Sequence, residues 1–107
     1  MIELTKENFD QEVTETKGVV FVDFWSPKCE KCLELFPEIE ALAEKNADKA
    51  KFCKLDAAAN RRLSMAQKVM GLPAFVFYLD GERVYMFDAG NIDLDAMQSK
   101  LDELAGS

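Results

Sequence analysis

The segment most informative about the fold is Trp25–Cys32, which reads Trp-Ser-Pro-Lys-Cys-Glu-Lys-Cys. It follows the apolar run Val19–Phe24 and precedes a helical pattern, so two cysteines lie where a strand becomes a helix. The unpaired backbone N–H groups and the dipole at a helix N-terminus favour a thiolate over a thiol. Cys29 is therefore predisposed to be a nucleophile, and Cys32, one turn later, can capture a mixed disulfide.

A Cys-x-x-Cys pair can also be a structural disulfide or half of a zinc site. A tetrahedral zinc site takes four Cys, His or carboxylate ligands, but the chain has no histidine and only one further cysteine, Cys53. A metal site would need carboxylates or a second chain. The position of the pair favours redox chemistry, and we expect neither a metal nor another cofactor.

Length and composition indicate one small globular domain over residues 1–107, enough to bury roughly two thirds of the unfolded chain's surface. Hydrophobic residues make up 49% of the chain, and no stretch is long enough to cross a bilayer. Met1–Thr5 lacks the basic region and apolar core of a secretory signal, so we expect a cytoplasmic protein. In a reducing cytosol, a Cys-x-x-Cys pair is more often catalytic or metal-binding than a permanent crosslink.

The charge balance limits the partners. Thirteen basic and twenty acidic side chains give a formal net charge of −7. This charge argues against nucleic acid or an anionic membrane as the main partner and favours solubility. We expect a monomer.

Hydrophobic periodicity predicts the element order β α β α β α β β α. The expected strands are residues 2–4, 19–24, 51–55, 74–79 and 82–87. The expected helices are one capped by Thr5 that runs through Phe9 and Val13, one opened by Cys32, one capped by Asn60 and one capped by Asp93. Helices between the early strands imply parallel pairing, and the last hairpin adds an antiparallel edge. The predicted class is α/β, with a central mixed sheet of about five strands and four helices covering both faces.

Four residues inside these elements carry specific expectations. Pro37 should kink the helix that Cys32 opens. Gly71, in a left-handed conformation, should end the helix that Asn60 caps. Cys53, flanked by apolar neighbours in a strand, is expected to be a small buried hydrophobe. Asp23 is the one carboxylate in the run 19–24, and it either reaches water at the strand end or lies buried near the cysteines.

Over its whole length the chain resembles the thioredoxin family. The resemblance rests on length, element order and five separately placed features: Val22-Asp23-Phe24-Trp25 four residues ahead of Cys29-Glu30-Lys31-Cys32, the kink proline Pro37, Lys54 beside the aspartate, the Leu72-Pro73 loop and the Asp80-Gly81 hairpin turn. It implies a thioredoxin fold and a thiol-disulfide oxidoreductase.

The resemblance also assigns catalytic roles. Cys29 would attack a substrate disulfide, and Cys32 would resolve the mixed disulfide. Asp23, if buried, would have a raised pKa and could accept the proton of Cys32. Lys54 would moderate that shift by pairing with Asp23, the alternative being a solvated ion pair.

The substrate side of the site rests on the same resemblance. Pro73, if cis, would present the backbone of Leu72 to an extended substrate segment, although the sequence alone indicates an ordinary loop proline. Trp25 either shapes and shields the dithiol or is a core aromatic. Gly90 belongs to the family's contact loop, but it lies one residue farther from the hairpin turn than the family's usual glycine.

The chain departs from the family around its cysteines. Lys28 stands where thioredoxins usually carry an aromatic residue, and Glu30-Lys31 replaces Gly-Pro. Glu30 disfavours a thiolate at Cys29 while the two lysines favour it, so their balance sets the redox potential. A charged rim also suggests a dedicated partner.

We therefore expect a protein-disulfide reductase that carries electrons from a thioredoxin-reductase-like donor, flavin- or ferredoxin-dependent, to protein disulfides. The alternatives are an oxidant or disulfide isomerase, a binding module that keeps the fold but uses its cysteines little, and a dimer that bridges an iron–sulfur cluster through Cys29.

Overall fold

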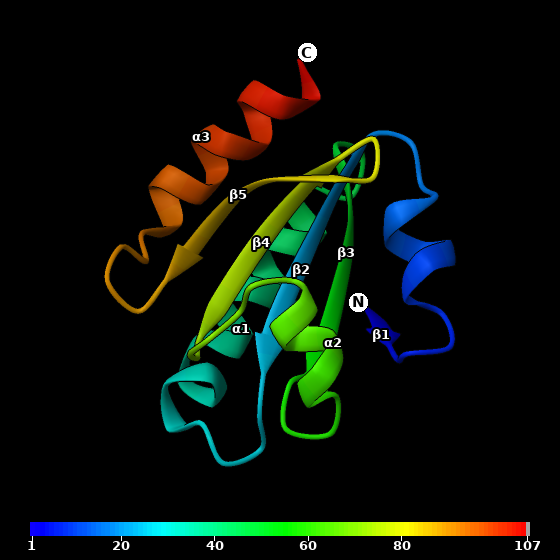
Figure 1. Cartoon of the computed structure of the whole chain (residues 1–107). Coiled ribbons are helices and arrows are strands. Elements are labelled where there is room, and N and C mark those ends of the chain that lie inside the picture. The colour runs from blue at the N-terminus through cyan, green and yellow to red at the C-terminus, as the bar shows by residue number, and fades with distance from the viewer. Residues whose placement is uncertain (107) are drawn as a thin grey trace.

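The computed structural model describes residues 1–106 and contains a five-stranded mixed sheet (Figure 1) with the strand order β1-β3-β2-β4-β5. Strand β3 runs parallel to β1 and β2, whereas β4 is antiparallel to β2 and to β5. The strands are β1 Ile2–Leu4, β2 Val19–Trp25, β3 Ala50–Asp56, β4 Ala74–Leu79 and β5 Glu82–Asp88. The predicted α/β class, element order and mixed pairing are confirmed.

Four helical segments lie on the two faces of this sheet. They are the π-helix η1 Asp10–Thr14 and the α-helices α1 Glu30–Lys45, α2 Arg61–Ala66 and α3 Leu94–Ala105. In Figure 1, α1 passes behind the sheet and α2 in front of it. Among residues 1–106, no helix has the length and apolar character needed to span a membrane.

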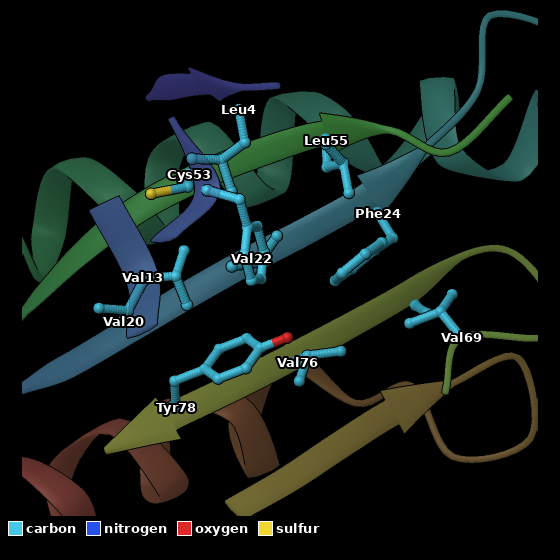
Figure 2. Packing of buried hydrophobic residues seen from close by; sticks show 12 residues of the cluster. Leu4, Val13, Val20, Val22, Phe24, Cys53, Leu55, Val69, Val76 and Tyr78 are labelled. Carbon is cyan, nitrogen blue, oxygen red and sulfur yellow. The ribbon is translucent and has the colours of Figure 1, made fainter. Parts of the chain in front are cut away.

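Two hydrophobic clusters form because side chains alternate between the faces of a strand. Figure 2 shows the cluster that β2 shares with β4, η1 and the segment after α2, which contains Val13, Val22, Val69 and Tyr78. The other cluster packs Phe21 of β2 against apolar side chains of α1 and α3. Strand β2 is therefore covered on both faces, as its continuous apolar run predicts.

The helix before the dithiol strand is shorter than expected. The Thr5 hydroxyl accepts hydrogen bonds from the backbone N–H groups of Glu7 and Asn8 at 3.2 and 3.3 Å, as its predicted capping role requires. The regular part that follows is the five-residue π-helix η1. Helix α1 begins at Glu30 rather than Cys32, because Cys29 is its N-cap, and it continues past Pro37 to Lys45.

The predicted end of α2 is wrong. The helix stops at Ala66, and the left-handed residue is Lys68, with φ 64°, rather than Gly71. The N–H of Val69 donates to the Ser64 carbonyl at 3.0 Å and the N–H of Lys68 to the Met65 carbonyl at 2.9 Å, which is a Schellman motif. This ending turns Val69 into the first cluster, and burial of Val69 offsets the cost of a left-handed lysine.

Of the remaining predicted caps and turns, two are confirmed and one is wrong. Asp93 caps α3 by accepting the N–H of Ala96 at 3.1 Å, as predicted. Asp80 and Gly81 have φ values of 52° and 87°, which suit a two-residue hairpin. Asn60 precedes α2, but its side chain makes no capping bond and donates instead to the Asp56 carbonyl at 3.0 Å.

Candidate active site

The dithiol lies at the start of α1, beyond the C-terminal end of β2. Cys29 and Cys32 form a disulfide with their Cα atoms 5.2 Å apart. Cys29 is half-buried, whereas Cys32 is 4% exposed. The backbone N–H of Cys32 donates to Cys29 Sγ at 3.2 Å, so the helix N-terminus directs a hydrogen-bond donor at the more accessible sulfur.

A short turn places Cys29 at this position. The N–H of Cys29 donates to the Ser26 carbonyl at 3.0 Å, and the N–H of Lys28 donates to Ser26 Oγ at 3.2 Å. Ser26 is itself buried.

Asp23 is buried, with 2% exposure, and therefore does not reach water as an ordinary strand-end carboxylate would. Its Oδ1 atom has no hydrogen-bond partner within residues 1–106. Burial raises the pKa of Asp23 from 3.8 to about 7, while the positive charge of Lys54 acts in the opposite direction. The side chain can thus gain or lose a proton near neutral pH.

Lys54 pairs in register with Asp23 across β2 and β3, so both side chains lie on the same face of the sheet. The Lys54 ammonium lies 5.8 Å from the centroid of the Trp25 ring and 5.2 Å from that of Phe36. A cavity of about 200 Å³ is lined by Trp25, Cys32, Leu33, Phe36 and Lys54. The structure therefore brings three predicted site residues, Trp25, Cys32 and Lys54, around one small cavity.

Two further residues that line this cavity, Leu33 and Phe36, were not predicted from the sequence as site residues. The available signal was the spacing, because Phe36 follows Cys32 by four residues and residues four apart share one face of a helix.

The Leu72–Pro73 peptide bond is cis, and Pro73 is buried. Leu72 borders two surface cavities, one of about 350 Å³ shared with Ser26 and one of about 450 Å³ shared with Gly90. Met70, which the sequence analysis did not single out as a site residue, lines both and is 81% exposed. Gly90 therefore lies near Leu72 despite its shifted position in the chain.

The charged residues of the motif lie on the surface. Lys28, Glu30 and Lys31 are all exposed. Lys31 borders a separate cavity of about 630 Å³ together with Asp93 at the start of α3. Within residues 1–106, no cluster of three or more His, Cys, Asp or Glu side chains is arranged to hold a metal ion.

The third cysteine is a core residue, as expected. Cys53 is 0% exposed and belongs to the cluster in Figure 2. Burial raises the pKa of its thiol to about 12, so it remains a thiol at neutral pH.

Comparisons with known proteins agree with this geometry. The thioredoxin family model matches residues 1–103. A thioredoxin of Acetoanaerobium sticklandii is 39% identical, with 94% of this chain and 98% of that protein covered. One of Peptoclostridium acidaminophilum is 38% identical, with 94% of each covered.

A solved structure, that of a mutant thioredoxin from Halobacterium salinarum NRC-1, superposes with a TM-score of 0.85 at 31% identity over 97% of this chain and 89% of that chain. The fold, the disulfide-forming Cys29–Cys32 pair at a helix N-terminus and these relatives place the chain in the thioredoxin family of thiol-disulfide oxidoreductases.

Proposed function

We propose that this family member works as a protein-disulfide reductase in which Cys29 is the attacking thiolate and Cys32 the resolving thiol. The carrying observation is the asymmetry between the two sulfurs. Cys29 is the more accessible and receives the Cys32 N–H at 3.2 Å, whereas Cys32 is almost completely buried. An incoming disulfide can therefore reach Cys29 first, in the environment that favours its ionised form.

The reaction has two exchange steps. The Cys29 thiolate forms a bond to one sulfur of the substrate disulfide, and the other substrate sulfur leaves as a thiolate. Cys32 then loses its proton and attacks Cys29 Sγ, which forms the Cys29–Cys32 disulfide and releases the second substrate thiolate. The protein dithiol loses two electrons and two protons in total, and the substrate gains them.

Asp23 is the proposed acceptor of the Cys32 proton. A carboxyl with a pKa of about 7 can take up a proton at neutral pH and return it to solvent or product. Lys54 keeps enough of this carboxyl ionised to act, because its positive charge opposes the effect of burial. Both residues belong to one register pair on the sheet face that carries α1.

The proposed substrate-binding surface lies around Leu72, Pro73 and Gly90. Leu72 lies between two open cavities, so an extended segment can lie along it with apolar side chains on either side. The exposed Met70 adds a flexible apolar contact to both cavities. The proposed role of Trp25 is to shield the dithiol, because Trp25 lines the cavity that Cys32 also lines.

Lys28, Glu30 and Lys31 form the proposed specificity rim. Their mixed charge at the exposed edge of the dithiol favours a partner with complementary charges over a general range of disulfides. The proposed electron donor is a thioredoxin-reductase-like enzyme, and the proposed setting is a monomer in the cytoplasm.

The test is to trap the mixed disulfide. The reduced Cys32→Ser variant is mixed with a protein disulfide such as insulin, and the products are resolved by intact mass. The proposal expects a covalent complex through Cys29 with Cys32→Ser and none with Cys29→Ser. If Cys29→Ser forms the complex instead, the order of attack is reversed, and if neither variant does, the redox role fails.

A further inference from the structure

The Lys54 ammonium makes cation–π contacts with two aromatic rings. Lys54 carries a long flexible side chain, and within residues 1–106 none of the three ion pairs holds it. Its ammonium instead lies 5.8 Å from the Trp25 ring centroid and 5.2 Å from the Phe36 ring centroid. Both distances are within the range over which an aromatic ring attracts a cation.

The geometry points to Phe36 as a positioning residue for this dithiol: its ring and that of Trp25 hold the Lys54 ammonium beside Cys32 and Asp23. This inference rests on the proposed function, because it assigns a task to Lys54 that matters only if Asp23 exchanges a proton with Cys32. It adds a residue from the apolar face of α1 to the site.

The placement of Phe36 explains how it can act. Phe36 lies one helical turn after Cys32 in α1, so both side chains reach the same cavity of about 200 Å³. Trp25 closes the cavity from the end of β2, and Lys54 enters it from β3. The ammonium is thus contacted by aromatic residues of a strand and of a helix, with the disulfide beside it.

The register partners of Asp23 are Lys54 on β3 and the uncharged Phe75 on β4. Cys32 of α1 lines the same cavity as Lys54 and does not titrate in the disulfide form. Lys54 is the charged residue that acts on the Asp23 pKa. A change that lets the Lys54 ammonium move toward water should therefore raise the pKa of Asp23.

The experiment follows the Asp23 carboxyl carbon by NMR against pH in the oxidised protein, where neither Cys29 nor Cys32 titrates. Phe36→Leu keeps an apolar side chain but removes the ring, Phe36→Tyr keeps the ring, and Lys54→Met removes the charge. Tyr85→Leu is the matched control. It removes the ring of another lysine–aromatic pair, in which Lys100 Nζ lies 4.5 Å from the centroid of the Tyr85 ring.

Phe36→Leu should raise the midpoint of the Asp23 titration by about half a pH unit, and Lys54→Met should raise it at least as far. Phe36→Tyr and Tyr85→Leu should leave it in place. An unchanged midpoint in Phe36→Leu or in Lys54→Met overturns the proposal. A lowered midpoint in Phe36→Leu also overturns it, because Phe36 would then act by excluding water.

Kinetics separate this inference from the proposed function. In Phe36→Leu, the pH profile for release of the second substrate thiol should move upward with the NMR midpoint, while formation of the mixed disulfide stays unchanged. An NMR midpoint that moves without any shift in this profile contradicts the proposed proton transfer to Asp23 but leaves the positioning of Lys54 intact.

Discussion

Asp23 and Lys54 occupy directly opposed positions of the parallel β2–β3 pair, on the face of the sheet that α1 covers. The carboxyl is buried, and the Lys54 ammonium lies 5.8 Å from the Trp25 ring centroid and 5.2 Å from that of Phe36, so the two strands place a buried carboxyl and a positive charge on one face of the sheet. Burial of a carboxyl at this one position of an otherwise apolar strand costs free energy of folding.

That cost predicts a pH-dependent gain in stability for Asp23→Asn. The folded-state pKa of about 7 lies above the unfolded value of 3.8, so the unfolded chain gives up this proton first as pH rises. The folded protein therefore loses relative stability between about pH 4 and 7. Urea unfolding of the oxidised protein at pH 8 should show the variant more stable by on the order of 2–4 kcal/mol, with the gain fading at pH 4. An equal difference at both pH values would contradict this origin.

The same substitution should slow resolution of the mixed disulfide. Without a carboxylate, Cys32 must release its proton to solvent, and a positioned general base commonly contributes about 100-fold or more. Stopped-flow measurement of substrate-thiol release at pH 7 should show a loss of at least about tenfold in Asp23→Asn. The gap should close as pH approaches the range in which Cys32 ionises unaided. Equal rates at pH 7 would remove Asp23 from the mechanism.

Cys53 should not react in the native protein. Its thiol is buried, and its pKa is raised to about 12, so almost no thiolate is present at pH 8. Iodoacetamide should leave Cys53 unlabelled in the reduced folded protein and label it in urea, as located by peptide mass. Rapid labelling of a third cysteine without denaturant would show that the core around β3 opens.

Glycine positions give a matched pair of stability predictions. Gly81 has φ +87°, and a Cβ there would overlap the backbone carbonyl of Thr14, whereas Gly18 has φ +82° and open space around the added atom. Gly18→Ala should cost about 1 kcal/mol through the left-handed conformation alone. Gly81→Ala should cost clearly more, because backbone must also move. Equal losses of unfolding free energy in the two variants, measured in urea, would show that the Thr14 backbone moves aside without a cost.

The charged rim should act on Cys29 in opposite directions. Glu30→Gln removes a negative charge beside the nucleophile and should speed alkylation of Cys29 at pH 7 by about two- to threefold, whereas Lys28→Met should slow it by a similar factor. Raising the salt concentration should shrink both effects, because these side chains are exposed. Changes of the same sign in both variants would exclude a simple electrostatic role.

The fold was predictable from sequence wherever a pattern had a single physical reading. The apolar run 19–24 predicted a covered central strand, and Asp80-Gly81 predicted the hairpin turn. The end of α2 was not predictable in this way. Gly71 offers the better left-handed residue locally, but burial of Val69 selects Lys68, and that choice depends on tertiary packing.

The residues of the candidate site also differ in how well the sequence predicts them. Cys29, Cys32 and Asp23 stand out in the sequence as reactive or polar residues in a distinctive place. Phe36 does not, because an aromatic residue on the apolar face of a helix is usually a core residue. Its contact with Lys54 depends on how α1 crosses β3, and a sequence pattern does not fix that crossing.

The reduction potential of the Cys29/Cys32 pair decides whether the protein is a reductant. The protein is equilibrated in a series of dithiol buffers, and alkylated thiols are counted by mass. Because the charges of Lys28, Glu30 and Lys31 oppose each other, we expect a reversible two-electron couple near the usual thioredoxin value of roughly −270 mV. A potential well above that of the cytosolic glutathione pool, or no reversible disulfide at all, would contradict the assignment as a reductant.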